Sequence, residues 1–350
     1  LQAYPRGRRA GAVRIWTAMG SVAAVIGPLA GGALVQASWR WVFLVNIPIG
    51  VAAIAAGLRR LPAARGERGP FPDVIGTIVL IVSVGALTLA LVQGNEWHWD
   101  SARIIGLFAV AAVTLAWALL RAGRHPSPAF DLGLLRVPGV GGALASTFLL
   151  CTAFGAMIFS LVLLAEDTWG WSALDSGLAA APNAALVLPA AMLAGLLLGR
   201  RLATVPVMMT TGSLLYAAGI GWWRWGVHAA PAYVPNLLGG LLLAGVGLGF
   251  TMPVVFGAAT APLPPHRFAT GSALVNMVRQ VGITLGVALL VAVMRTPASG
   301  IVSIAGLDRG WVMMAIIAVV VPLPMLVRGR AAGAAGAAGT AGEDHQAAVR

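Results

Sequence analysis

The sequence lacks lysine altogether, and it is poor in charge of either sign. Only 10% of its 350 residues are charged and 59% are hydrophobic, whereas about a quarter of an ordinary globular chain is charged. Intrinsic disorder is excluded as well, because disordered chains combine low hydrophobicity with high net charge. Together with a mean hydropathy of +0.88, this balance predicts a protein that crosses a membrane several times.

Cysteine is almost absent too. With one cysteine, Cys151, the chain can form neither an intrachain disulfide nor a cysteine-based zinc cluster. Cys151 lies in an apolar block, where we expect it to be a small buried residue. The five histidines are scattered over connections and the tail, and none of the acids falls inside an apolar block. An intramembrane enzyme needs such groups together at membrane depth, so we expect no catalytic residue, no metal and no cofactor.

All 23 basic residues are arginines, and they give the chain a formal net charge of +12. They gather between the apolar blocks rather than along one face. This distribution is typical of membrane topology signals, so we expect no nucleic-acid partner.

Ten apolar blocks are long enough to cross a bilayer as helices, which takes about 20 residues for a hydrocarbon core of about 30 Å. Their approximate bounds are 12–35, 41–58, 74–92, 104–120, 139–164, 178–198, 205–223, 234–256, 270–294 and 311–327. Blocks such as 74–92 are apolar on every face, which argues against barrel strands, where apolar residues alternate. The fold class expected is an all-α polytopic membrane bundle.

The connections alternate in charge. If both termini are cytoplasmic, the inner segments hold 17 arginines and the outer segments hold five. The positive-inside rule therefore predicts cytoplasmic termini. The tail, 329–350, is rich in Ala and Gly and then polar, and is expected to be disordered.

Two stretches carry a family resemblance. The first span contains Gly20, Gly27, Pro28, Gly31 and Gly32, followed by the sequence SWRWVFLVNIPIG at 38–50. Residues 271–288 follow the pattern G-x7-R-Q-x-G-x3-G-x-A, and 167–172 read DTWGWS. These motifs resemble the fifth helix, the thirteenth helix and the ninth-to-tenth connection of the fourteen-helix multidrug:proton antiporter branch of the major facilitator superfamily.

The resemblance implies that the ten spans correspond to helices five to fourteen, without the first four. Residues 1–60 would then be the last two helices of an N-terminal bundle, 61–125 an inserted two-helix hairpin and 126–328 a six-helix C-terminal bundle. The chain opens at Leu1 in a basic stretch that is typical of an internal loop. A fragment, or an inactive truncated remnant, is therefore an alternative to a working transporter.

The glycines of the first span remove side chains from the helix surface, and Pro28 removes a backbone hydrogen bond. The resemblance favours a hinge or seal between two moving halves, formed by Gly20, Gly27, Pro28, Gly31 and Gly32, over plain tight packing. Under this reading the partners are a small-molecule substrate, protons and the lipid bilayer, and the oligomeric state stays open.

Arg279 is the most informative single residue, because a charge near mid-depth costs at least about 2.5–3.5 kcal/mol. It should face a polar cavity or a partner, with Asn276 and Gln280 beside it. The alternative is a structural arginine bonded to carbonyls of a neighbouring helix. Asn183 and Asn46 also lie in or at apolar spans, and each could line a path or simply bond between helices. The function implied by the resemblance is proton-coupled export of small amphipathic or cationic compounds at a bacterial inner membrane.

Overall fold

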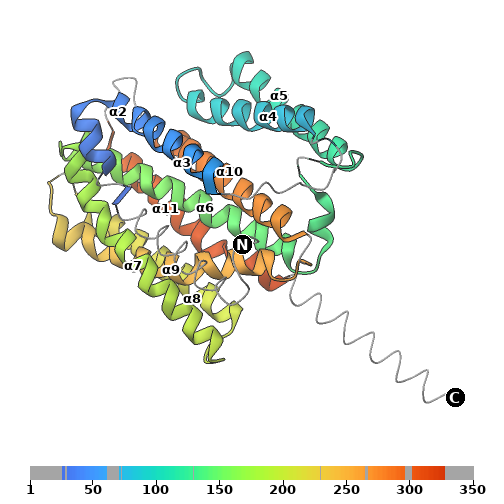
Figure 1. The fold of residues 1–350 in the computed structure, drawn as a ribbon. Helices are drawn as coiled ribbons and strands as arrows, with labels where there is room; N and C mark the ends of the chain where they lie inside the picture. The colour runs from blue at the N-terminus through green and yellow to red at the C-terminus, as the bar shows by residue number, and fades with distance from the viewer. Residues whose placement is uncertain are drawn as a thin grey trace.

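The computed structural model describes residues 26–27, 30–60, 71, 73–128, 130–228, 230–264, 267–295 and 302–327. These residues form helices and connections, with no strand among them (Figure 1). The predicted all-α fold class is therefore confirmed. The predicted disordered tail, Gly20 and Pro28 lie outside the described residues.

Residues 30–37 form a helical segment that precedes the first labelled element. The helices that follow are α2 (Trp39–Leu44), α3 (Asn46–Arg60), α4 (Val74–Gln93), α5 (Ala102–Ala122), η2 (Leu132–Arg136), α6 (Val140–Val162), η3 (Leu163–Thr168), α7 (Ala173–Gly199), α8 (Val205–Gly226), η4 (Tyr233–Leu238), α9 (Gly239–Thr260), α10 (Phe268–Met294) and α11 (Ile304–Val320).

Eight helical stretches in the described part are long and apolar enough to cross a membrane. They include α2 with α3 as one stretch, and α6 and α9 with their short π-helical extensions. The predicted span at 205–223 is the helix α8, which is not among the eight. This helix carries Thr210, Thr211 and Ser213, so its composition is more polar than that of its neighbours. The chain is a multi-pass membrane protein.

The last span starts earlier than the sequence indicates. The sequence predicts this span at about 311–327, but α11 begins at Ile304 and therefore includes Asp308 and Arg309. Both charges are satisfied within the helix by distant partners. Asp308 pairs with Arg224 at 3.2 Å, and the guanidinium of Arg309 donates to the carbonyl of Met294 at 2.6 Å. The predicted border was therefore wrong by two helical turns.

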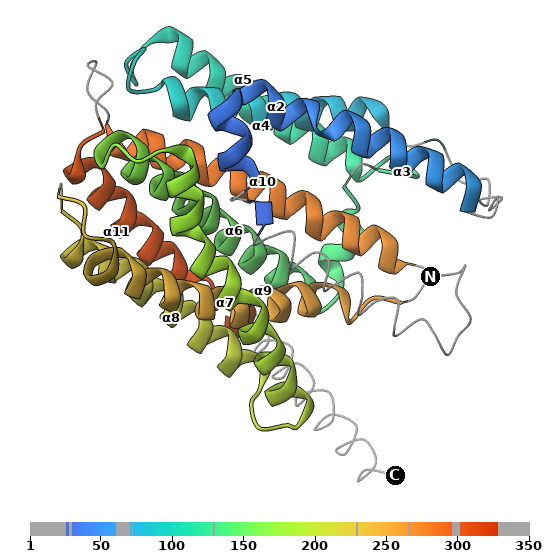
Figure 2. The ribbon, with the colours of Figure 1, turned by 60° about the vertical axis from the view of Figure 1, so that its left-hand side comes forward.

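The six helices α6 to α11 pack together in one bundle (Figure 2). Helix α6 contacts α9, α10 and α11, while α9 also packs between α7 and α8. The largest fully buried side chains are Trp223, Trp311 and Tyr216, which lie in the cluster that joins α8 to α11. This bundle is the core of the described structure.

The hairpin of α4 and α5 attaches to this bundle mainly through α4, which packs against α10. Helices α2 and α3 contact the rest much less, and none of their residues whose burial is described is buried. Their apolar side chains, such as Phe43 and Ile54, remain exposed within the described structure.

The two ends of the bundle differ in charge. The end at which α4 begins and α5 ends, called the basic end below, has seven arginines with described side chains and only two acids. The arginines are Arg59, Arg121, Arg124, Arg136, Arg200, Arg201 and Arg267, and the acids are Asp73 and Asp131. The opposite end, called the tryptophan end, carries Trp97, Trp99, Trp169 and Trp171 and has six acids for five arginines.

Glycines bring α6 and α10 into backbone contact. A methyl group on Gly282 would lie 2.8 Å from the carbonyl oxygen of Phe148, and one on Gly286 would overlap the carbonyl of Thr152. In the other direction, a methyl group on Gly155 would overlap the backbone of Ile283. At these three glycines the two backbones touch directly, which is a common packing mode in membranes.

We expect Gly286→Ala to lower the free energy of unfolding by about 1–3 kcal/mol, because the added methyl group must push α10 away from α6. The matched control is Gly257→Ala in α9, where a methyl group meets no described atom within 4 Å. Thermal unfolding of both purified variants in detergent measures the difference. Equal midpoints for the two variants would contradict the close contact.

Candidate functional site

Arg279 lies near the middle of α10, where its charge is farthest from both ends of the helix. Its Nε is buried and has no hydrogen-bond acceptor among the described residues. At about 100° per residue, Arg279 lies at the edge of the α10 face that packs on α6 through Gly282 and Gly286. A guanidinium in this position still requires an acceptor or water.

Next to Arg279, α10 exposes a stripe of polar side chains. Four of them are spaced four residues apart, so they form a row that winds slowly around the helix. All four are exposed: Ser272, Asn276, Gln280 and Thr284. Polar amides and hydroxyls are rare on lipid-facing surfaces, because hydrocarbon offers them no partner. This row therefore faces water or protein. Asn276 and Gln280 were predicted, whereas Ser272 and Thr284 were missed, although the four-residue spacing is visible in the sequence.

The two other asparagines predicted for the path, Asn183 and Asn46, lie elsewhere. Asn183 is buried in α7, and its side-chain amide donates to the carbonyl of Leu241 in α9 at 2.9 Å. Asn46 is exposed at the start of α3 and donates to the carbonyl of Val42 one turn earlier, also at 2.9 Å. The structure thus brings neither of them to the polar row on α10.

Of the predicted hinge glycines that the structure describes, namely Gly27, Gly31 and Gly32, one makes a close contact with the six-helix bundle. Gly32 is buried against the start of α7, where a methyl group would lie 2.5 Å from the carbonyl oxygen of Ala173. One turn later the side-chain amide of Gln36 donates to the hydroxyl of Ser172 at 3.3 Å. Methyl groups on Gly27 or Gly31 would meet no described atom within 4 Å. The glycine motif therefore contacts α7 at Gly32.

A cavity of about 460 Å³ opens beside this contact at the tryptophan end. It is lined by Trp171, Asp175 and Tyr233, together with apolar residues of α7. The Tyr233 hydroxyl donates to the carbonyl of Ala179 at 3.0 Å, and the Trp171 ring lies 6.0 Å from the Tyr233 ring. Two fixed aromatic rings and a carboxylate can accommodate an organic cation.

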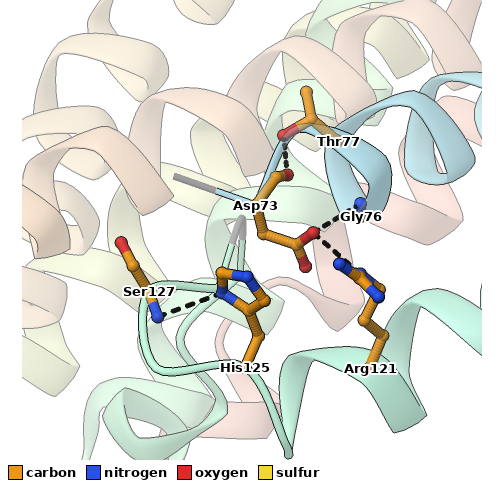
Figure 3. Close-up of polar contacts among 6 residues, drawn as sticks. All are labelled: Asp73, Gly76, Thr77, Arg121, His125 and Ser127. Atoms are coloured by element: carbon orange, nitrogen blue, oxygen red, sulfur yellow. Dashed lines mark hydrogen bonds and ion pairs between the residues drawn. The ribbon is translucent and has the colours of Figure 1, made fainter. Parts of the chain in front are cut away.

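The polar cluster in Figure 3 joins the hairpin to the connection that leads into the six-helix bundle. The carboxylate of Asp73 accepts from the N–H of Gly76 at 2.8 Å and from Nε of Arg121 at 2.7 Å. Its backbone N–H donates to the carbonyl of Ser127 at 3.1 Å, and the Ser127 N–H donates to Nδ1 of His125 at 3.1 Å. Asp73 therefore caps α4, pairs with α5 and holds the connection after α5. Its side chain is 1% exposed.

These contacts also set the protonation of Asp73. Burial raises the pKa of its carboxyl, but the Gly76 N–H, the Arg121 guanidinium and the nearby His125 outweigh burial, so the pKa lies below its usual value. Asp73 is therefore ionised at neutral pH. In the part of the chain that the structure describes, no group of three His, Cys, Asp or Glu side chains could hold a metal ion.

Comparison with known proteins matches the sequence of this chain to one family. The profile of the Major Facilitator Superfamily covers residues 1–287. The chain belongs to the Major Facilitator Superfamily. The family predicted from the sequence motifs is thus confirmed, and membership in it indicates transport rather than catalysis.

Several curated proteins are similar in sequence to this chain. Multidrug resistance protein Stp of Mycobacterium tuberculosis is 31% identical over 297 residues, which are 83% of this chain and 54% of Stp. The tetracenomycin C resistance and export protein of Streptomyces glaucescens is 29% identical, over 82% of this chain and 53% of its own. Multidrug export protein EmrB of Escherichia coli K12 is 28% identical, over 83% and 56%. The chain spans about half the length of the curated relatives it matches.

For the hairpin junction we expect stability to fall in the order wild type, Asp73→Asn, Asp73→Ala. Asparagine keeps a capping acceptor for Gly76 but loses the charge that pairs with Arg121, whereas alanine loses both. Hydrogen exchange of the amides in the first turn of α4 measures the effect, and we expect it to be faster in Asp73→Ala than in Asp73→Asn.

The difference in stability between wild type and Asp73→Asn should be full at neutral pH and should decrease only in acid. Because the folded pKa lies below the unfolded value of about 3.9, the ionised carboxylate stabilises the fold above that value. Its contribution is lost as the pH falls through the lower, folded pKa. A difference that shrinks between pH 8 and pH 6 would contradict this assignment.

Proposed function

We propose that this chain forms part of a secondary transporter that exports small amphipathic or cationic compounds in exchange for protons, by alternating access between two helical bundles. The observation that carries the proposal is the polar row on α10 beside Arg279. A row of exposed amides and hydroxyls next to a buried guanidinium nitrogen without a described acceptor supports a hydrated path at this face of α10.

The path would run along the face of α10 that points away from α6 and from the hairpin. Arg279, Asn276 and Gln280 are assigned to it, and Ser272 and Thr284 extend it toward both ends of α10. Asn183 and Asn46 were also candidates, but their hydrogen bonds to Leu241 and Val42 give them a sufficient structural role. We therefore place the path on α10.

The glycine motif is assigned to the seal between the two moving halves. Gly32 lets the helical segment 30–37 approach the backbone of α7 closely, and such a contact can open and close without side chains that interlock. In this assignment residues 1–60 end the N-terminal bundle, 61–125 form an inserted hairpin and 126–328 form the C-terminal bundle.

The charge difference between the two ends supports the proposed orientation. The basic end is assigned to the cytoplasm of a bacterial cell, because arginines accumulate on that side of inner-membrane proteins. The tryptophan end then faces outward, and its acids and aromatic rings would meet the exported compound on release. The cavity of Trp171, Asp175 and Tyr233 suits a cationic group at that point.

The substrate class draws on the relatives as well. Their names concern multidrug resistance, multidrug export, and tetracenomycin C resistance and export. The described part holds its acids only at helix ends and in connections. We therefore assign the proton-carrying group to residues outside the described part.

Transport can be tested with inverted membrane vesicles from cells that express the complete gene and lack their own drug pumps. With respiration acidifying the vesicle interior, we expect ethidium to enter, and we expect uptake to stop when nigericin collapses the proton gradient. Uptake that continues without the gradient would contradict proton coupling. No uptake of ethidium or of a neutral amphipathic dye would contradict export.

Arg279→Ala should reduce this uptake by at least about tenfold, because a group that interacts with the substrate or its water is removed. Arg279→Lys keeps the charge without the planar donors and should retain an intermediate rate. Arg200→Gln, at the exposed basic end of α7, is the control and should transport normally. Equal amounts of each variant in the membrane must be verified by immunoblot. A wild-type rate for Arg279→Ala would leave Arg279 with a structural role only.

A further inference from the structure

A second cavity, of about 380 Å³, lies between the hairpin and the six-helix bundle. Its walls are one face of α4, the last turns of α5, the middle of α10 and Phe148 of α6. Phe130, in the connection after α5, also lines it near the basic end. The cavity thus extends from the Asp73–Arg121 pair to about the middle of α4, on a side of α10 that does not carry the polar row.

The cavity has almost no free hydrogen-bonding groups that could hold a water molecule. Its lining is apolar except for Asp73 and Ser83, and both already have partners: Asp73 pairs with Arg121, and the Ser83 hydroxyl donates to the carbonyl of Ala111 at 2.9 Å. A buried water needs two to four polar partners, so an occupant of this space is apolar. In a bilayer the apolar groups at hand are acyl chains.

The hairpin has polar contacts at both ends of its long axis. At the tryptophan end, the side-chain amide of Asn95 donates to the carbonyls of Val291 and Ala292 in α10, each at 3.1 Å. At the basic end, Asp73 joins α4 to Arg121 of α5 and to the carbonyl of Ser127 in the connection that leads to α6. The cavity lies along the hairpin between these two sets of contacts, where α4 faces α10.

The rim at the basic end is positively charged. Arg121 is 29% exposed and uses its Nε for Asp73, and Arg124 is exposed immediately after α5. Arg136 is exposed at the other end of the same connection. The two acids of this region are engaged, since Asp73 pairs with Arg121 and Asp131 accepts from the N–H of Gly133 at 2.8 Å. An anionic group at the rim could therefore accept hydrogen bonds from guanidinium N–H groups that Asp73 does not occupy.

We propose that this cavity binds one acyl chain of an anionic phospholipid, whose phosphate lies at Arg121 and Arg124 on the basic end. The inserted hairpin is then joined to the bundle partly through a bound lipid. Binding requires neither export nor a proton gradient, so the proposal stands or falls independently of the proposed function.

The test is native mass spectrometry of the purified chain in a mild detergent, titrated with dioleoyl phosphatidylglycerol or dioleoyl phosphatidylcholine. The two lipids have the same acyl chains and differ in headgroup charge. We expect one phosphatidylglycerol to be retained where phosphatidylcholine is lost. Equal retention of the two lipids, or retention of neither, would overturn the proposal.

Three variants test the position of the acyl chain. Ala118→Phe fills the cavity from α5 and should abolish retention, whereas Ala116→Phe places the same ring on the exposed face of the same helix and should not. Val278→Phe fills the same space from α10, so the test does not depend on a single variant folding. Unchanged retention in a folded cavity-filling variant would overturn the acyl-chain site.

For the headgroup, Arg124→Gln should weaken phosphatidylglycerol binding about fivefold, the loss expected for one arginine near a phosphate. Arg200→Gln removes an equally exposed arginine from the same end of the bundle but far from the hairpin, and should leave binding unchanged. Equal effects of the two substitutions would show non-specific attraction to the basic end and would overturn the assigned phosphate position.

Discussion

Hydrocarbon supplies no hydrogen-bond partners, and this one constraint determines most of what the structure shows. Backbone groups are satisfied within helices, and buried polar side chains find partners inside the protein, as Asn183 does at Leu241 and Ser83 at Ala111. The charged residues of α11 have partners as well. Asp308 pairs with Arg224, and Arg309 donates to the carbonyl of Met294. Exceptions in the described part include the polar row on α10, the Nε of Arg279, the Tyr216 hydroxyl and the Trp311 indole N–H. Arg279 differs from the other buried groups because it is charged, and a charge at this depth requires a ligand, water or further protein as its partner.

The sequence was sufficient for the features that depend on local composition. The helical class and most of the spans follow from apolar runs that hydrocarbon thickness requires, and the family follows from short motifs around Gly32 and Arg279. Asn276 and Gln280 were found because they adjoin Arg279. Ser272 and Thr284 extend the same row and could have been found by following the four-residue spacing in both directions.

Features that depend on distant partners could not be read from one sequence. The start of α11 was misplaced because the partners of Asp308 and Arg309 lie on α8 and at the end of α10. Asp73 looked like an ordinary acid at the end of a span, yet it pairs with Arg121, 48 residues later. The partner of Asn183, the carbonyl of Leu241, lies 58 residues away on α9. In each case the pairing follows from how the helices pack, which the sequence pattern alone does not specify.

Helix α10 has three different surroundings. One face meets α6 through glycines, the second borders the hairpin and its cavity, and the third carries the polar row. The contact with α6 is made backbone to backbone at Gly155, Gly282 and Gly286. Arg279 comes directly after Val278, which belongs to the cavity wall, so any displacement of α10 along its axis would move Arg279 and that wall by the same amount.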